Sequence, residues 1–109
     1  NDPPSDATVH LKWEEPANGW NAPKLSSWLD CAIQEASESF YGKPALAMGE
    51  GGTIPFMAML GEKFPEAQFV ITGVLGPESN AHGPNEFLHI PFAKKLSACI
   101  GYILNQYPR

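Results

Sequence analysis

The sequence predicts an α/β fold with a mostly parallel sheet. Short apolar runs at residues 9–13, 45–48 and 69–74 alternate with three helix-like segments, in two of which apolar residues recur every three or four positions. Turn-forming glycine and proline residues separate these runs. The alternation indicates strands joined by helices, and crossover connections of the usual right hand make such strands parallel.

The first predicted strand comprises residues 9–13. Val9, Leu11 and Trp13 alternate with polar residues, which is the period of a half-buried strand. A polar tail, residues 1–7, precedes it, and a turn-rich connector, residues 15–23, follows it. We expect this strand to belong to a different sheet from the two that come later.

The clearest helix is predicted to follow Lys24. Its apolar residues recur at helical spacing, and Gly42 supplies the stop signal. Such a stripe indicates a face that packs in a core and carries no function. The residues of the stripe are Leu25, Trp28, Leu29, Ala32, Ile33, Ala36 and Phe40.

A glycine-rich junction connects the second strand, residues 45–48, to a helix at residues 54–60 with Pro55 in its first turn. A helix start presents free N–H groups, which suit an anion such as a substrate carboxylate. Glu50 could instead meet a substrate ammonium group. The alternative is a plain strand-to-helix turn. A phosphate-binding loop is excluded because the Lys-Ser/Thr pair is missing.

The third strand, residues 69–74, leads into a polar loop that contains His82, and a final helix begins near Pro91. A lone loop histidine is usually a solvated surface residue, although an imidazole at the end of a strand can also be a ligand. We interpret His89 as a surface or capping residue. The final helix is predicted to bury Phe92, Leu96, Cys99, Ile100, Ile103 and Leu104 on one face.

Composition narrows the classes of function. The formal charge is −5 and the seven Lys and Arg residues are scattered, so nucleic acid is not expected as a partner. No apolar run is long enough to cross a membrane. Two distant cysteines, Cys31 and Cys99, form neither a zinc knot nor a disulfide framework. We predict that both are buried free thiols in a reducing, cytoplasmic compartment.

Two motifs resemble the C-terminal catalytic portion of the zinc-dependent aminoacylase/carnosinase/carboxypeptidase family of metallopeptidases, and the non-specific dipeptidases in particular. They are residues 49–55 (G-E-G-G-T-I-P) and residues 79–86 (S-N-A-H-G-P-N-E), which contain the pattern A-H-x-x-N-E. With the helix patterns around them, the resemblance covers residues 8–106.

The resemblance implies a role for each motif. His82 would be a ligand of a two-zinc centre, and Asn85 or Glu86 would orient its imidazole or brace the loop. The first motif would bind the substrate. Its substrate-binding residues would be Glu50, Gly51, Gly52 and Thr53.

The resemblance also implies a domain organisation. The chain would be part of a three-layer α/β/α catalytic domain. Residues 1–22 would be a tail, the last strand of an inserted lid or dimerisation domain, and a connector, while residues 23–109 would be the C-terminal part of the catalytic domain. Two strands are too few for a self-sufficient sheet. The expected partners are the remainder of the parent domain and a second subunit in a homodimer.

The implied activity is hydrolysis of the amide bond of dipeptides or N-acyl amino acids by a water molecule that two zinc ions activate. A carboxylate general base would deprotonate that water. The chain holds neither H-x-D nor H-E-x-x-H, so the base and the other ligands are expected elsewhere and the isolated chain is expected to be inactive. Glu50 favours substrates with a free amino group. Two alternatives are a ligand-binding or regulatory module without metal, and a small interaction domain whose loops are simple turns.

Overall fold

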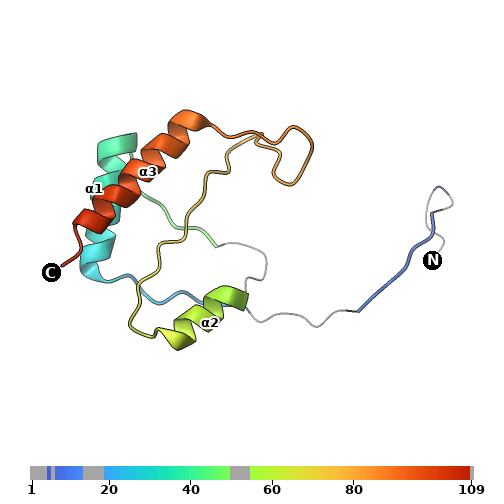
Figure 1. Cartoon of the computed structure of the whole chain (residues 1–109), viewed down its shortest axis with the longest axis horizontal. Helices are drawn as coiled ribbons and strands as arrows, with labels where there is room; N and C mark the ends of the chain where they lie inside the picture. The colour runs from blue at the N-terminus through green and yellow to red at the C-terminus, as the bar shows by residue number, and fades with distance from the viewer. Residues whose placement is uncertain (1–4, 6, 14–18, 50–54, 109) are drawn as a thin grey trace.

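Three helices make up the regular structure of the residues that the computed structural model describes, which are residues 5, 7–13, 19–49 and 55–108. The helices are α1 (Ser27–Tyr41), α2 (Pro55–Lys63) and α3 (Ile90–Asn105). Helices α1 and α3 pack against each other, whereas α2 contacts neither of them and lies apart (Figure 1).

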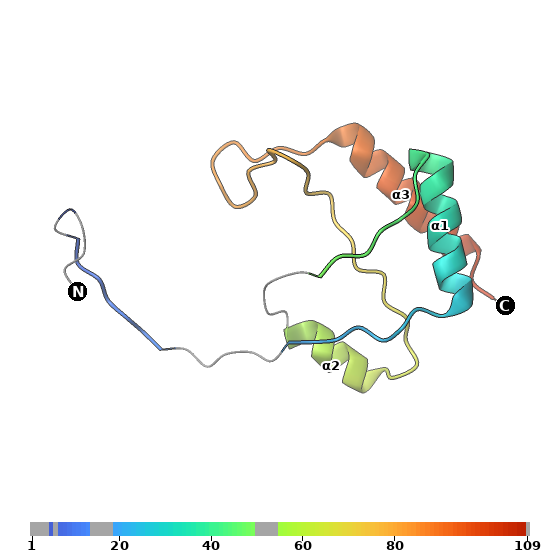
Figure 2. The ribbon, with the colours of Figure 1, turned by 180° about the vertical axis from the view of Figure 1, so that it is seen from behind.

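The predicted α/β fold with a mostly parallel sheet is wrong, because no strand occurs in the described part of the chain. Residues 9–13, 45–48 and 69–74 contain no strand. A strand requires a neighbour at about 4.8 Å to pair its N–H and C=O groups. In Figure 2 the segments 45–48 and 69–74 run in different directions, and residues 9–13 extend away from the body. The sequence pattern correctly indicated apolar segments, but in the described structure these segments have no neighbouring strand with which to pair.

The core lies between α1 and α3. Leu29, Ala32 and Ala36 of α1 are buried against Cys99 and Ile103 of α3. The two alanines have small side chains, and small side chains allow two helices to approach each other, because the distance between helices depends on the side chains at their contact. Larger side chains surround this centre: Leu25, Trp28, Ile33, Phe40, Tyr41 and Tyr102.

Two tyrosines add polar links between the same helices. The Tyr41 hydroxyl donates to the Phe92 carbonyl at 3.0 Å, and the Tyr102 hydroxyl donates to Oε2 of Glu35 at 2.9 Å. The bond to Glu35 is the largest of the effects that raise the pKa of Tyr102. Residues of α3 are therefore bonded to α1 both near its C-terminus and in its middle.

Two predicted helix boundaries are confirmed, namely the stop at Gly42 and the start of the final helix near Pro91. Gly42 follows α1 with a left-handed φ of 66°, and its N–H donates to the Glu38 carbonyl at 2.9 Å. Glycine adopts this conformation at low cost, which explains why the helix ends there. Before α3, Nδ1 of His89 accepts from the Phe92 N–H at 3.1 Å, so His89 is the capping residue that we expected.

Helix α1 also fixes two of the extended segments. The Gln34 side-chain amide donates to the Ala45 carbonyl at 3.2 Å and accepts from the Ala45 N–H at 3.0 Å. It thus pairs one backbone residue as a neighbouring strand would. At the other end of the helix, the Ser26 N–H donates to Oε1 of Gln68 at 2.6 Å.

Many apolar side chains remain exposed, and the chain is elongated. The radius of gyration is 19.0 Å, compared with about 13 Å for a compact chain of this length. The most exposed large apolar residues are Leu46, Trp13, Leu11, Met48 and Leu104. Leu104 was predicted to be buried and is 71% exposed, because it lies beside rather than within the α1 contact. None of the helices in the described ranges is long and apolar enough to cross a membrane.

The prediction of two buried thiols is half correct. Cys99 is buried, and its Sγ donates to the Ala36 carbonyl at 3.6 Å. Cys31 is exposed and lies on the outer face of α1, where its Sγ is 3.8 Å from Oε1 of Glu35. Both are free.

We expect Leu29→Ala to lower the free energy of unfolding by about 2–5 kcal/mol, because Leu29 is 1% exposed and its removal leaves a cavity in a small core. The matched control Leu104→Ala should change it by less than about 0.5 kcal/mol, since this side chain is mostly in solvent. Urea denaturation followed by helical circular dichroism measures both. Equal losses would contradict the core described above.

The two cysteines should differ in reactivity. Burial raises the pKa of the Cys99 thiol, so at neutral pH it forms even less thiolate than an ordinary cysteine does. We expect an aromatic disulfide reagent at pH 8 to modify Cys31 in the native chain and Cys99 only after denaturation. Cys31→Ser should abolish the fast phase, whereas Cys99→Ser should leave it unchanged. A fast phase that survives Cys31→Ser would refute this assignment.

Candidate functional site

The loop at residues 76–86 consists of three successive turns. In the first, the Ser79 N–H donates to the Gly76 carbonyl at 3.2 Å, and in the second the Gly83 N–H donates to the Asn80 carbonyl at 3.0 Å. The third turn contains Pro84 and Asn85. All three have a residue of positive φ in their third position, which is the signature of a type II turn.

The third position of the second turn is occupied by His82, with a φ of 60°. Type II turns favour glycine or asparagine there, since left-handed backbone costs another residue about 1–2 kcal/mol. Glu78 has a φ of 63° in the first turn and Asn85 a φ of 59° in the third. Backbone strain of this kind often gathers at functional sites. The turn itself does not require an imidazole, so its presence at this position calls for a separate reason.

Side chains within the loop hold the turns together. Ser79 is 3% exposed, its hydroxyl accepts from the Gly76 N–H at 3.0 Å, and its carbonyl accepts from the Phe87 N–H at 3.2 Å. The last bond joins the two ends of the loop. The Asn80 side-chain amide donates to the Pro84 carbonyl and so crosses the turn that carries His82.

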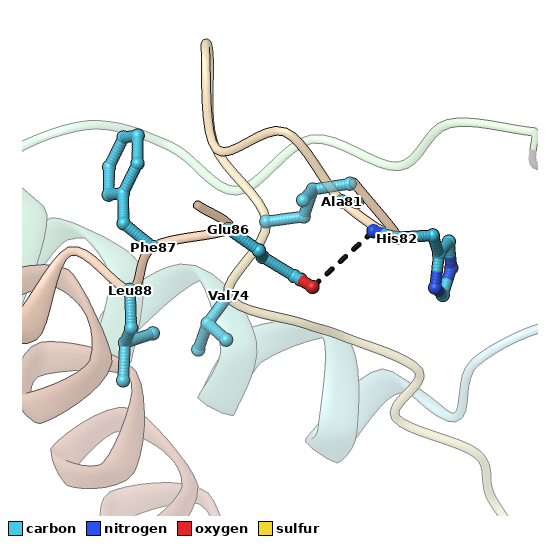
Figure 3. Close-up of a pocket in the computed structure, with 7 residues that line it drawn as sticks. Val74, Ala81, His82, Glu86, Phe87 and Leu88 are labelled. Carbon is cyan, nitrogen blue, oxygen red and sulfur yellow. Dashed lines mark hydrogen bonds between the residues drawn. The ribbon is translucent and has the colours of Figure 1, made fainter. Parts of the chain in front are cut away.

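A pocket with a volume of about 620 Å³ lies beside this loop. Its walls are mostly apolar, with His82 and Glu86 as the polar members. Figure 3 shows the His82 ring directed away from Phe87 and Leu88. The full lining is Val74, Leu75, Ala81, His82, Glu86, Phe87 and Leu88.

His82 is exposed, and the loop contacts it through its backbone. Its N–H donates to Oε2 of Glu86 at 3.3 Å (Figure 3). Neither Glu86 nor Asn85 is bonded to the imidazole in the described structure. Glu86 therefore lies against the backbone of the turn, and Asn85 occupies the third position of the following turn.

The predicted substrate-binding motif cannot be placed relative to this loop. Glu50, Gly51, Gly52 and Thr53 lie outside the described residues. The helix that follows them, α2, is present as predicted and has Pro55 in its first turn.

The described residues do not form a metal centre by themselves. No group of three or more His, Cys, Asp or Glu side chains comes together within them. A catalytic zinc ion ordinarily has three protein ligands, so a single imidazole does not suffice. Within the described loop at residues 76–86, His82 is the imidazole that is exposed and could serve as a donor. His89 is less suitable, because its Nδ1 already accepts the capping bond from Phe92.

Sequence reasoning did not single out Ser79 and Asn80 as structural members of the site. Serine and asparagine side chains commonly bond nearby backbone groups in turns, and both residues precede His82 in a segment rich in glycine and proline. That composition was the available signal. Which backbone group each side chain reaches depends on the folded turns.

Comparison with known proteins yields one informative similarity. The chain is 35% identical over 81 residues to a cysteinylglycine-S-conjugate dipeptidase of Corynebacterium striatum. The match covers 68% of this chain and 17% of the relative, so the chain spans less than a fifth of that dipeptidase. No family model matches the chain. The similarity supports, at a coarse level, the resemblance to peptidases that the two motifs indicate.

The strained turn makes a prediction about substitutions of His82. Because φ is 60°, His82→Gly should relieve the strain of the turn, whereas His82→Ala keeps a Cβ in left-handed backbone, so the turn should be about 1 kcal/mol more stable in the glycine variant than in the alanine variant. The Gly83 amide, which bonds to Asn80, should then exchange its hydrogen roughly fivefold faster in the alanine variant than in the glycine variant. Equal exchange rates in the two variants would show that the left-handed conformation is not maintained in solution.

Proposed function

We propose that this chain is a segment of a metal-dependent dipeptidase, in which His82 supplies one zinc ligand. The observation that carries the proposal is that an exposed imidazole stands at a strained turn position, within a motif that resembles a metallopeptidase motif. The partial similarity to a dipeptidase supports the same reading.

The contribution of this chain would be to hold the imidazole. The turn exposes the His82 ring, while the bonds of Ser79 and Asn80 brace the backbone on both sides of it. Two zinc ions are the centre that the motif implies, and such a centre supplies Lewis acidity for amide hydrolysis. Because the described donors do not complete it, the remaining ligands and the general base would come from other parts of the parent protein.

The proposed substrates are dipeptides or N-acyl amino acids. Glu50, Gly51, Gly52 and Thr53 would bind the substrate, with Glu50 favouring a free amino group. The proposed partners are the remainder of the parent domain and a second subunit. The exposed apolar residues Leu46, Met48 and Ile71 support extensive contacts with other parts of the parent, since a stable surface rarely leaves so many uncovered. The domain division at residues 22 and 23 and the cytoplasmic location stay predictions.

A second candidate function is a ligand-binding or interaction module without metal. The observation that favours it is the absence of a gathered donor group in the described residues. The two candidates differ in whether the full-length protein contains zinc.

We expect the full-length protein that carries this chain to contain zinc, and His82→Ala to lower zinc affinity by more than about 100-fold, since loss of a residue that merely supports a ligand already costs up to that much. Zinc content after gel filtration and hydrolysis of a dipeptide measure the effect. The isolated 109-residue chain should hydrolyse no dipeptide.

His89→Asn provides the matched histidine control, because asparagine also caps helices and should preserve the start of α3. It should retain zinc and activity. A full-length protein without zinc would refute the metallopeptidase proposal and favour the interaction module. Turnover by the isolated chain would refute the proposed division of the active site.

A further inference from the structure

We infer that Asn80 is a positioning residue for the His82 imidazole, an inference that rests on the proposed ligand role of His82. Asn80 is the first residue of the turn in which His82 is the third. It bonds to the chain on the far side of His82 at two points. Its carbonyl accepts from the Gly83 N–H at 3.0 Å, and its side-chain amide donates to the Pro84 carbonyl.

The conformation of Asn80 suits this role. Its φ is 54°, and asparagine is among the few residues other than glycine that adopt left-handed backbone readily. The Asn80 side chain thus reaches the Pro84 carbonyl across the turn, and asparagine tolerates the left-handed backbone at this position without replacement by glycine.

Gly83 provides the space that the Asn80 side chain occupies. A Cβ built on Gly83 would lie 2.7 Å from Nδ2 and 2.8 Å from Oδ1 of Asn80, which is closer than nonbonded atoms tolerate. No left-handed φ demands glycine at this position. The reason for glycine is therefore the close approach of the Asn80 amide, and any larger residue would displace it from Pro84.

The bond to Pro84 requires a donor. An amide N–H meets the Pro84 carbonyl, whereas an aspartate of the same shape would place a carboxylate oxygen against it. Aspartate also tolerates left-handed backbone. Asn80→Asp thus removes the donor and keeps the size and backbone preference. Opening of the turn would free the imidazole to point in several directions and would reduce its effectiveness as a ligand.

The first readout is structural and independent of activity. In the full-length protein, Asn80→Asp should accelerate hydrogen exchange at the Gly83 amide roughly threefold to tenfold, the range expected for loss of one hydrogen bond. Glu78→Gln is the matched control. It exchanges an acid for an amide in the same loop, also at positive φ, and its side chain is exposed. This control should leave the exchange rate unchanged.

Gly83→Ala tests the same contact without introducing a charge. Its Cβ should displace the Asn80 side chain and weaken zinc binding as Asn80→Asp does. The two substitutions should not be additive when combined, because each removes the same bond. Additive effects would mean that the variants act through separate contacts, and would overturn the inference.

The second readout is zinc affinity, measured by competition with a chromogenic chelator. We expect both variants to bind zinc about 10–100-fold more weakly than the unmodified protein, the range for residues that orient a ligand. Hydrolysis should recover at saturating zinc, which a general loss of folding would not allow. Unchanged zinc affinity, or unchanged exchange at Gly83, would overturn the role of Asn80.

The outcome for His82→Ala separates this inference from the proposed function. If that variant loses zinc while Asn80→Asp binds zinc normally, His82 is a ligand and the positioning role of Asn80 is refuted. If His82→Ala keeps all its zinc, the ligand role fails, and the positioning role fails with it even where Asn80→Asp accelerates exchange at Gly83. Parallel losses in both variants support both conclusions.

Discussion

The contact between α1 and α3 is the constraint on which the rest of the described structure depends. Its centre consists of Leu29, Ala32 and Ala36 facing Cys99 and Ile103. Among the described helices, α1 and α3 are the pair that packs together. Three described segments outside the helices are attached to these two helices. Residue 45 is bonded to Gln34, residue 68 is bonded to Ser26, and the His82 loop leads directly into the capped start of α3.

The His82 loop obtains its shape in another way. It owes little to the core, because its hydrogen bonds connect its own residues: Ser79 with Gly76 and Phe87, and Asn80 with Gly83 and Pro84. Bonds of this local kind can hold several residues in left-handed backbone whose conformation would otherwise be unfavourable. The loop is thus a largely self-contained unit that α3 anchors at one end. Such a unit can present an imidazole whether or not a sheet forms nearby.

An incomplete site is consistent with the extent of the similarity. The chain matches 17% of a bacterial dipeptidase, and no group of donor side chains in its described residues gathers around His82, whereas the proposed zinc centre needs several ligands. The exposed apolar side chains support the same interpretation, since the α1–α3 contact buries only a small part of the apolar surface. The proposed zinc centre would therefore require further residues, and the exposed apolar surface is consistent with the same proposal.

The sequence alone determined the helices and the identity of the candidate ligand. The stripe of α1, the stop at Gly42 and the cap at His89 were predictable because helices form from bonds between residues four apart and end where local backbone allows. Tertiary structure decided everything that depends on distant neighbours. Apolar runs at residues 45–48 and 69–74 have strand composition, but a strand exists only with a partner. Likewise Cys31 and Leu104 have helical spacing, yet only the position of the opposing helix left them exposed. The sequence identified His82, while its φ of 60° and the bond from Asn80 to Pro84 arise only when the turns fold together.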